Sequence, residues 1–591
     1  MEGMEGMEGI ERREPAAQAT TWLELHGAGV GDRVGLALRE GVGIGLAVTG
    51  GHRGWATSDP VAAVARLDAV FRPRWVWWDR TTSDPLAAAD LAIARCWDVL
   101  TVHRLLHGGW RTSIPRCWAW TYGLPTDSLP AMGQLDLLGD HADEGGDPDE
   151  PVRSDGHLRP EWVGEGWQRD PERLAHWARL ALDVADRQTD RLAERPAPER
   201  AISTAHSESA AELLCAELAV HGLPIDEREA VRIISEAVGP RPADLAEEER
   251  LREQRDLEVL RHLEPGPRVD LRNPVEVRSM LRRVAVDVPD TRAWRLERHR
   301  DTHPVVPALL TWRKAERIAT TYGYRWLDEH VRDGRLIGDW SSTDGAAGRM
   351  TASAGLHNLP TEMRPAVAAE PGHRFVRADL GQIEPRVLAA VSGDAALIAA
   401  TADDDLYQPV ADRLGVERSV AKVAVLGAMY GATTGESAHA LRGLERAYPT
   451  AMGFLEAAAA AGRAGDDVLT VGGRRVRMWV DDAIDGDIDG ARRVAAARGR
   501  FARNATIQGA AAEFFKVWAI IVRMRGRALG ARVALCLHDE LLVHVPADQA
   551  DATVEMLHDA LAEAAFRWSP HRNVRYLADV GVISRWSEAK S

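Results

Sequence analysis

The amino-acid sequence predicts an α+β protein built from several domains. Its 591 residues far exceed the roughly 100–200 residues of one domain, so three to five domains or subdomains are expected. Hydrophobic residues make up 45% and charged residues 27% of the chain, a globular composition that excludes a largely disordered or fibrous protein. Strand-like and helix-like segments alternate in the first and last thirds, and the middle is helical, as expected for mixed architecture.

Residues 1–9 repeat Met-Glu-Gly three times and lack the basic and apolar segments of a secretory signal, so we expect a disordered tail at 1–15. The sequence contains no run of about 18 uncharged apolar residues, so we expect no membrane-spanning helix. The cysteines are scattered without Cys-x-x-Cys pairs, which indicates neither a zinc site nor a disulfide framework and favours a reducing cytoplasm.

Residues 29–50 and 61–108 predict a small α/β domain. Small and apolar residues alternate over 29–50 as in a β-hairpin, and 61–108 combines two helical stretches with an apolar strand. Residues 136–155 hold eight acidic residues and predict a loop, and 171–194 has the pattern of an amphipathic helix.

The distribution of charge matters more than its total. The net charge is −16, yet residues 491–532 contain ten basic residues and one acidic residue. Such a stripe fits a phosphate backbone, although a solvated helix face has the same composition. Only four of the 73 basic residues are lysines, among them Lys422 and Lys516, so a retained lysine hints at a specific role.

Two segments place carboxylates at the ends of predicted strands. A short strand leads to Asp379, where a carboxylate suits a metal ion, although on this segment alone a helix N-cap is the simpler interpretation. Residues 533–545 read as a hairpin whose turn carries His538, Asp539 and Glu540. Adjacent carboxylates repel unless a cation relieves them. Asp379 and Asp539 could therefore hold two metal ions about 3.5–4 Å apart for phosphoryl transfer.

Two predicted helices present functional faces. Arg418, Lys422, Leu426 and Tyr430 are spaced by four residues and form one stripe, with cations suited to a triphosphate and an aromatic ring suited to stacking. An amphipathic surface helix is the alternative. Further along, Arg500, Asn504 and Gln508 place donors on one face, which suits phosphates and minor-groove acceptors or an ordinary polar face.

Together these segments resemble the motifs of family A DNA polymerases, the DNA polymerase I type, in order, spacing and residue type. Residues 379–386 are similar to motif A, 418–431 to motif B and 538–540 to motif C. The segment from Asn504 to Lys516 resembles the one between motifs B and C, and the stretches at 348–353, 356–360 and 312–322 resemble further upstream segments. The resemblance covers 204–591.

The resemblance implies a right-hand fold of palm, fingers and thumb, preceded by an α/β RNase H-like domain of the 3′–5′ exonuclease type. The implied parts are a tail at 1–15, an exonuclease-like domain at 16–195, a thumb region at 196–335, palm at 336–400, fingers at 401–500 and palm at 501–591.

The resemblance also implies a template-directed DNA polymerase that adds dNTPs to a primer 3′-hydroxyl. Asp379 and Asp539 would ligate two Mg²⁺ ions, for which Mn²⁺ can substitute, with Glu540 supporting them and Lys422 acting as general acid. The implied dNTP-binding residues are Arg418, Lys422, Leu426, Tyr430, Gln382, Glu384 and Tyr407, with Glu384 closing the sugar pocket below the 2′ position. The implied DNA-binding residues are Arg349, Asn358, Arg500, Asn504, Gln508, His538, Arg313 and Arg317.

The nucleotide pocket departs from the family pattern. Leu426 stands where phenylalanine or tyrosine is usual, Val425 where asparagine is common, and Leu380 where motif A has tyrosine. Tyr407 replaces a triphosphate-binding histidine. We therefore expect a less aromatic pocket with one imidazole donor fewer.

The exonuclease-like domain lacks its expected acids. The first strand-like region, 34–49, has no Asp-x-Glu and offers only Glu40, while Asp79, Asp98 and Asp183 stand in no convincing motif. We expect an exonuclease-like fold with a degenerate site. The alternatives are a polymerase whose exonuclease still works and a catalytically dead DNA-binding scaffold.

We expect primer-template DNA and dNTPs as partners, a monomer, no membrane, and a cytoplasmic, nucleoid-associated location. The joint presence of Asp379, Asp539, Lys422 and Arg418 argues against the scaffold, because a dead enzyme has no physical need for mutually repelling carboxylates.

Overall fold

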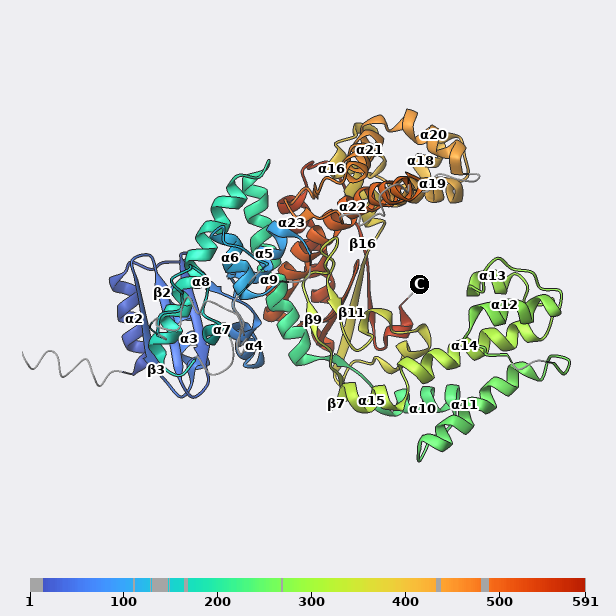
Figure 1. Ribbon diagram of the computed structural model, residues 1–591, viewed down its shortest axis with the longest axis horizontal. Helices are drawn as coiled ribbons and strands as arrows, with labels where there is room; N and C mark the ends of the chain where they lie inside the picture. Colours follow the sequence, from blue (N-terminus) through green and yellow to red (C-terminus); the bar gives the residue numbers. More distant parts are fainter. Residues whose placement is uncertain are drawn as a thin grey trace, which may run out of the picture. The chain divides into compact units, whose positions relative to one another are not determined.

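The computed structural model describes residues 14–589 except for 110–111, 128, 130–146, 148, 164–167, 267–268, 432–436 and 480–487 (Figure 1). The predicted tail lies outside the described residues up to residue 13, as does most of the predicted acidic loop. The chain forms two compact units. The larger comprises 1–221, 340–351 and 376–582, and the smaller comprises 222–339, 352–375 and 583–591.

The larger unit begins with a five-stranded sheet in the order β3-β2-β1-β4-β5. The first two strands pair antiparallel, which confirms the hairpin predicted over 29–50, and the last two run parallel to β1 and to each other. The strands are β1 (Arg33–Arg39), β2 (Gly43–Val48), β3 (Gly51–Ala56), β4 (Arg74–Trp77) and β5 (Cys96–Asp98).

Helices cover both faces of this sheet because side chains alternate along each strand. Val34, Leu36 and Leu38 face α2 and α3, whereas Ala37 lies in the core formed with α8. Helix α8 confirms the amphipathic helix predicted at 171–194. The helices are α2 (Pro15–Leu25), α3 (Pro60–Phe71), α4 (Arg80–Ala88), α5 (Val99–His107), α6 (Ile114–Thr121), α7 (Pro160–Val163) and α8 (Pro171–Ala193).

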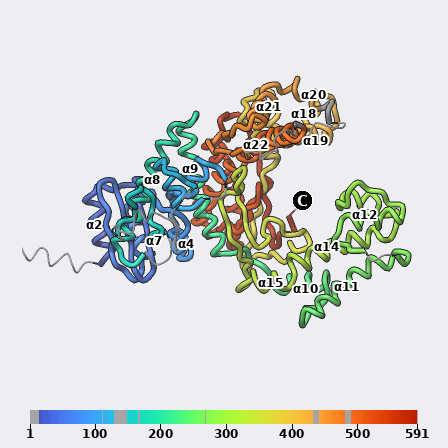
Figure 2. Tube along the Cα trace, viewed as in Figure 1, coloured from blue at the N-terminus to red at the C-terminus, as the bar shows by residue number. Residues whose placement is uncertain are grey.

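A second sheet, in the order β14-β15-β11-β16, lies later in the larger unit. Its strands are β11 (His373–Leu380), β14 (Arg532–Leu537), β15 (Glu540–Pro546) and β16 (Ala578–Ile583). Helices α9 (Pro198–His221), α22 (Ile488–Gly526) and α23 (Ala550–Trp568) pack on β14 and β15. Although α9 and α22 are far apart in the sequence, they lie side by side (Figure 2).

The other helices of the larger unit come from the second half of the chain. They are α16 (Ile383–Ser392), α17 (Ala395–Ala400), α18 (Tyr407–Leu414), α19 (Arg418–Tyr430), α20 (Ser437–Ala447) and α21 (Pro449–Ala464). Two short ladders pair β9 (Trp340–Ser341) with β10 (Thr351–Ala352) and β12 (Val468–Leu469) with β13 (Arg475–Val476). Helix α22 runs without interruption across residues 500 and 501, where the sequence predicted a boundary between fingers and palm.

The smaller unit is mainly helical, and its core gathers Val277, Leu281 and Leu309. Helix α9, at the start of the predicted thumb region 196–335, lies in the larger unit. The elements are α10 (Glu227–Val238), α11 (Leu245–Leu260), α12 (Pro274–Arg283), α13 (Ala293–Glu297), α14 (Val305–Thr321), α15 (Tyr324–His330) and the strands β6 (Leu223–Pro224), β7 (Val331–Arg332) and β8 (Arg335–Leu336).

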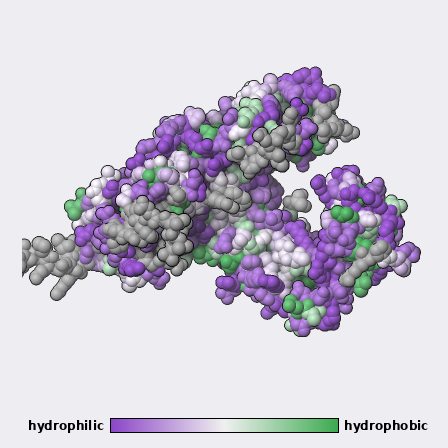
Figure 3. Space-filling view, in the orientation of Figure 1, coloured by the Kyte–Doolittle hydropathy of each residue, from purple (hydrophilic) through white to green (hydrophobic). Residues whose placement is uncertain are grey.

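One helical stretch of the described chain, 489–529, is long and apolar enough to cross a membrane, but 89% of its most apolar window is buried inside the protein. Its apolar character therefore serves packing, since α22 contacts α9, α21 and α23. The face of the molecule seen in Figure 3 is mostly hydrophilic, with apolar residues scattered over it.

Candidate active site

Three carboxylates meet where β11 and the β14–β15 hairpin end. Asp379 is the penultimate residue of β11, Asp539 lies in the hairpin turn, and Glu540 opens β15. The Leu380 N–H donates to the Asp539 carbonyl at 2.8 Å and ties the two strand ends together. The N-cap interpretation of Asp379 is wrong, because α16 begins at Ile383 and its N-cap is Gln382, whose φ is 53°.

Arg377 lies among these carboxylates, and the sequence analysis missed it. Its Nη2 donates to Asp379 Oδ2 at 2.6 Å and to Glu540 Oε2 at 3.0 Å, and its Nη1 is 3.5 Å from Asp579 Oδ2. Residues 377 and 379 share one face of β11 because side chains alternate along a strand. That spacing of two was the signal available in the sequence.

The carboxylates disfavour one another's charged forms. Burial, followed by the charge of Asp539, raises the pKa of Asp379 to about 6, and Arg377 opposes that shift. Burial and the charge of Glu540 raise the pKa of Asp539. Neighbouring carboxylates, whose repulsion a cation relieves, could hold a divalent metal ion.

Helix α19 presents the predicted stripe as one accessible face. Arg418, Lys422 and Tyr430 are exposed and Leu426 is half-buried, whereas Val425 packs inward. The helix at 418–430 is thus confirmed. Lys422 has no ion pair or hydrogen bond with any other described residue, so its ammonium is available to a ligand.

Arg418 is held in place from the neighbouring loop. Its Nε donates to Asp405, and its guanidinium lies 5.8 Å from the centre of the Tyr407 ring. Gln382 fixes the same loop, since its Nε2 donates to Asp405 Oδ1 at 2.8 Å and its Oε1 accepts from the Leu406 N–H at 2.8 Å. Tyr407 is only 4% exposed and therefore lies beneath Arg418.

Glu384, in the first turn of α16, is held between Arg349 and Tyr430 of α19. Its Oε1 accepts from Arg349 Nη2 at 3.0 Å, and its Oε2 accepts from the Tyr430 hydroxyl at 2.9 Å. Burial and then the charge of Glu384 raise the pKa of Tyr430, so the phenol stays protonated as a donor. This link leaves one carboxylate clamped between an arginine and a tyrosine.

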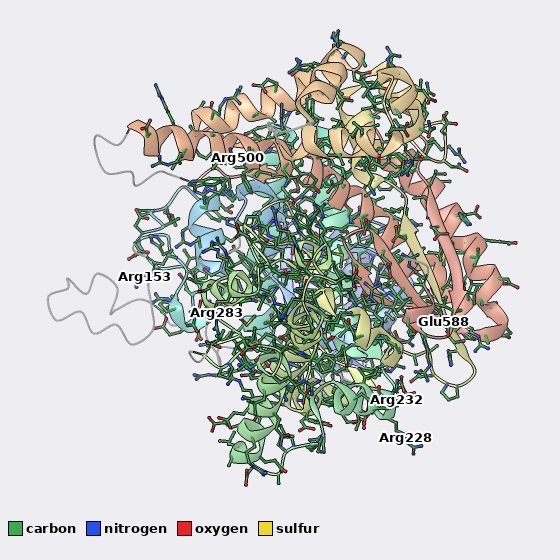
Figure 4. All side chains as sticks on the ribbon, turned by 90° about the vertical axis from the view of Figure 1, so that its right-hand side faces the viewer. Arg153, Arg228, Arg232, Arg283, Arg500 and Glu588 are labelled. Carbon is green, nitrogen blue, oxygen red and sulfur yellow. The ribbon has the colours of Figure 1, made fainter. Side chains whose placement is uncertain are left out.

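The remaining predicted DNA-binding residues of the larger unit lie on α22 and the hairpin turn. Asn504 and Gln508 are half-buried, and Arg500 and His538 are exposed. Arg500 lies on α22 (Figure 4), and its stem packs against Gly431, where an added Cβ would be 2.9 Å from Arg500 Cγ.

The smaller unit brings two other predicted DNA-binding residues together. Arg317 Nη2 donates to the Asn358 carbonyl at 2.6 Å, and the Tyr322 hydroxyl donates to the same oxygen at 2.7 Å. Arg313 instead donates to the Thr291 carbonyl and is half-buried. Arg317 and Asn358 therefore remain at the surface, while Arg313 also supports the fold.

The basic segment 491–532 is neither one phosphate-facing stripe nor one solvated face. Lys516 is fully buried and donates to both carboxylate oxygens of Glu208, at 2.8 and 2.7 Å. Arg523 forms a buried bidentate pair with Glu217, with both distances 2.7 Å. These cations join α22 to α9. Lys516 therefore has a packing role, and the rarity of lysine in this chain does not make it a ligand-binding residue.

The N-terminal acids are arranged differently from those at β11. Asp79 caps α4 and accepts from the Thr81 N–H and hydroxyl at 3.0 and 2.6 Å. Asp98 caps α5 and also accepts from Trp77 Nε1 at 3.0 Å. Asp183 lies on α8 and pairs with Arg179 at 2.8 Å. Asp79 and Asp98 line one cavity of about 290 Å³, whereas Asp183 is not among its lining residues.

Helix α8 lies directly against the first strands of this sheet. A Cβ added to Gly35 would lie 2.4 Å from the Ala178 carbonyl oxygen, and one added to Gly45 would lie 2.1 Å from the Ala175 nitrogen. Side chains at these positions of β1 and β2 would displace the helix, so this face cannot carry the missing carboxylates without rearrangement.

Known proteins are similar to this chain in sequence and in fold. The family model described as DNA polymerase family A matches residues 275–588. DNA polymerase I of Chloroflexus aurantiacus is 34% identical over 299 residues, which are 45% of this chain and 31% of that protein. The thermostable DNA polymerase I of Thermus aquaticus is 30% identical over 326 residues, 50% of this chain and 38% of that one.

The matched regions span less than two fifths of the length of these two relatives. A solved structure, the POL domain of Pol1 from M. smegmatis in complex with DNA primer-template and dNTP, has a TM-score of 0.67 at 23% identity and covers 98% of both chains. The fold is therefore the α+β polymerase fold that the sequence predicted. Since the family model covers more than half of the sequence, the chain belongs to DNA polymerase family A.

Proposed function

We propose that this protein is a template-directed DNA polymerase that adds dNTPs to a primer 3′-hydroxyl. The observation that carries the proposal is that Asp379, Asp539 and Glu540 lie at adjoining strand ends, in the same unit as the exposed stripe of α19. The structural relative was solved with DNA primer-template and dNTP, which supports the same ligands for this chain.

In this proposal Asp379 and Asp539 hold two Mg²⁺ ions, or Mn²⁺ ions in their place. Bound divalent ions lower the pKa of the attacking hydroxyl and stabilise the charge on the reacting and leaving phosphates. Glu540 supports the site from the first position of β15. The same sheet fixes all three backbones, so the carboxylates are positioned before substrate arrives.

Arg418 and Lys422 bind the triphosphate in this proposal. Asp405 and the Tyr407 ring hold the guanidinium of Arg418 toward solvent, where its planar fork can bond phosphate oxygens. Lys422 is an exposed, flexible ammonium one helical turn further on, so it can donate a proton to the leaving pyrophosphate.

Glu384 and Tyr430 shape the sugar pocket. The clamp between Arg349 and Tyr430 holds the Glu384 carboxylate in one position, where it excludes a 2′-hydroxyl by steric conflict. Leu426 contributes an apolar but nonaromatic surface next to the base. The pocket therefore selects deoxyribose by shape.

DNA binding is assigned to donors at several surfaces. Asn504, Gln508 and Arg500 of α22, with Arg349 and His538, follow the primer terminus and minor groove, whose acceptors are largely shared by correct base pairs. The smaller unit supplies Arg317 and Asn358, and more weakly Arg313, to the duplex as part of the thumb.

We assign the N-terminal domain a structural role without exonuclease activity, because Asp79 and Asp98 cap helices and α8 covers β1. The protein would act as a cytoplasmic monomer at the nucleoid.

The proposal is tested with a 5′-labelled primer annealed to a longer template, with Mg²⁺, in the presence and absence of all four dNTPs. We expect extension with dNTPs and an unchanged primer without them. A primer that is shortened without dNTPs would show a working exonuclease. An unchanged primer in both reactions, with DNA binding intact, would favour the scaffold.

A further inference from the structure

Arg377 occupies the centre of the carboxylate site. It lies on β11, with Glu540 on the adjacent strand β15 and Asp579 on the opposite neighbour β16. One nitrogen, Nη2, serves both Asp379 and Glu540, at 2.6 and 3.0 Å. The side chain is 11% exposed, and its Nε has no hydrogen-bond partner among the described residues.

This guanidinium group stands where a cation would relieve the carboxylates. A divalent ion binds carboxylate oxygens at about 2.0–2.1 Å, so it would use the same oxygens or their immediate neighbours. Two cations so close repel each other, most strongly in a partly buried site where water screens little. Arg377 and a divalent ion must therefore compete for the charge of Asp379.

We propose that Arg377 is an internal counter-ion of the metal site that lowers its affinity for divalent cations until a nucleotide binds. The inference rests on the proposed function. In the metal-free protein Arg377 neutralises Asp379 and Glu540 and keeps the strand ends together. The phosphates of a bound triphosphate add negative charge, so metal loading becomes coupled to nucleotide binding.

Asp579 modulates this competition. Its side chain is 78% exposed and faces the other guanidinium nitrogen, Nη1, at 3.5 Å. Asp579 pairs with part of the positive charge of Arg377. It can remain the partner of the guanidinium when a divalent ion binds Asp379. Arg377 is therefore a positioning residue, and its effect should appear in metal affinity before any chemistry occurs.

The test measures Mn²⁺ binding to the full chain without DNA or nucleotide, by the electron paramagnetic resonance signal of free Mn²⁺. Loss of one charge-assisted contact is worth roughly a factor of ten or more in an equilibrium constant, so Arg377→Gln should bind Mn²⁺ about tenfold more tightly. Arg377→Lys keeps the positive charge, so its Mn²⁺ affinity should stay close to that of the wild type.

The same titration is repeated with a dideoxy-terminated primer, template and the next correct dNTP, which blocks chemistry. Here the wild type should gain more Mn²⁺ affinity than Arg377→Gln does. Equal or weaker Mn²⁺ binding by a folded Arg377→Gln protein would overturn the proposal and leave Arg377 a purely structural role.

A second variant covers the case in which Arg377→Gln does not fold. Asp579→Asn changes an exposed side chain and returns the full charge of Arg377 to the metal ligands, so Mn²⁺ affinity should fall about twofold. Asp548→Asn, at an exposed site without contact to Arg377, is the matched control and should not change it.

Unchanged Mn²⁺ affinity in Asp579→Asn would contradict the proposed sharing of charge. The two proposals fail separately. If the wild type extends primers but its Mn²⁺ affinity does not depend on Arg377, only the counter-ion proposal is contradicted. If the wild type cannot extend primers but its Mn²⁺ affinity depends on Arg377, only the proposed polymerase function is contradicted.

Discussion

In the described part of the chain, two sheets place aspartates at the ends of their strands, and the two sets of acids have different partners. At β11 and the β14–β15 hairpin, Asp379 and Asp539 approach from two strand ends, and an arginine reduces their repulsion. At β4 and β5, Asp79 and Asp98 cap helices, and Asp98 also accepts a tryptophan N–H.

The difference lies in what each carboxylate oxygen already binds. A carboxylate offers about four lone-pair sites, and backbone or indole N–H groups that occupy them stabilise a local fold at the expense of a ligand. Asp98 is buried and accepts from two such donors, whereas Asp379 accepts from Arg377, whose side chain can move. A strand-end aspartate can therefore bind a metal ion only where its oxygens remain available.

The largest effect should come from removing an acid of the second sheet. We expect Asp379→Ala and Asp539→Ala to lower the primer-extension rate by at least about 10³-fold, because metal-assisted charge stabilisation is worth several kcal/mol. Binding of primer-template should stay within a few-fold of the wild type. Single-turnover extension and fluorescence anisotropy measure the two quantities, and normal extension by either variant would refute the metal assignment.

The corresponding change in the first sheet should alter stability instead. Asp98→Ala removes an N-cap and leaves Trp77 Nε1 buried without its acceptor, which should lower the free energy of unfolding by about 2 kcal/mol. Asp98→Asn keeps an acceptor and should cost less. Thermal unfolding measures both variants, with Asp183→Ala on α8 as the control. If the wild type shortened primers and Asp98→Asn did not, the contrast between the two sheets would be wrong.

The sequence was informative where chemistry requires a residue type at fixed spacing. It predicted the α19 stripe, the 533–545 hairpin and the hairpin at 29–50, since helix and strand periodicity decide those elements locally. It could not assign Lys516, whose partner Glu208 lies 308 residues away, or show that Arg377 lies between Glu540 and Asp579. Those contacts depend on which strands and helices become neighbours, which no local pattern encodes.

Glu384 is clamped between Arg349 and Tyr430 of α19. Glu384→Ala should raise ribonucleotide incorporation about tenfold relative to dNTP incorporation, because the space below the sugar opens. Tyr430→Phe removes one hydrogen bond to Glu384 and should have a smaller effect of about fivefold. Competition between rNTP and dNTP measures the ratio, and unchanged sugar selectivity in Glu384→Ala would remove it from this role.

The smallest expected effect is the pH dependence of stability without metal. The pKa of Asp379 is raised from 3.8 to about 6 in the folded protein, so the folded state holds this proton more tightly than the unfolded chain does. The free energy of unfolding that Asp379 contributes therefore falls as pH rises from about 4 to about 6, and changes little above.

Asp379→Asn removes that titration. In EDTA its Tm should approach that of the wild type near pH 4 and exceed it by a few degrees at pH 7. Added Mn²⁺ should raise the Tm of the wild type and reduce the gap, because the ion replaces the proton as the partner of the carboxylate. A difference in Tm that does not change with pH would mean that Arg377 already neutralises the charge of Asp379 fully. The two sheets would then differ only in the hydrogen-bond donors that surround their acids.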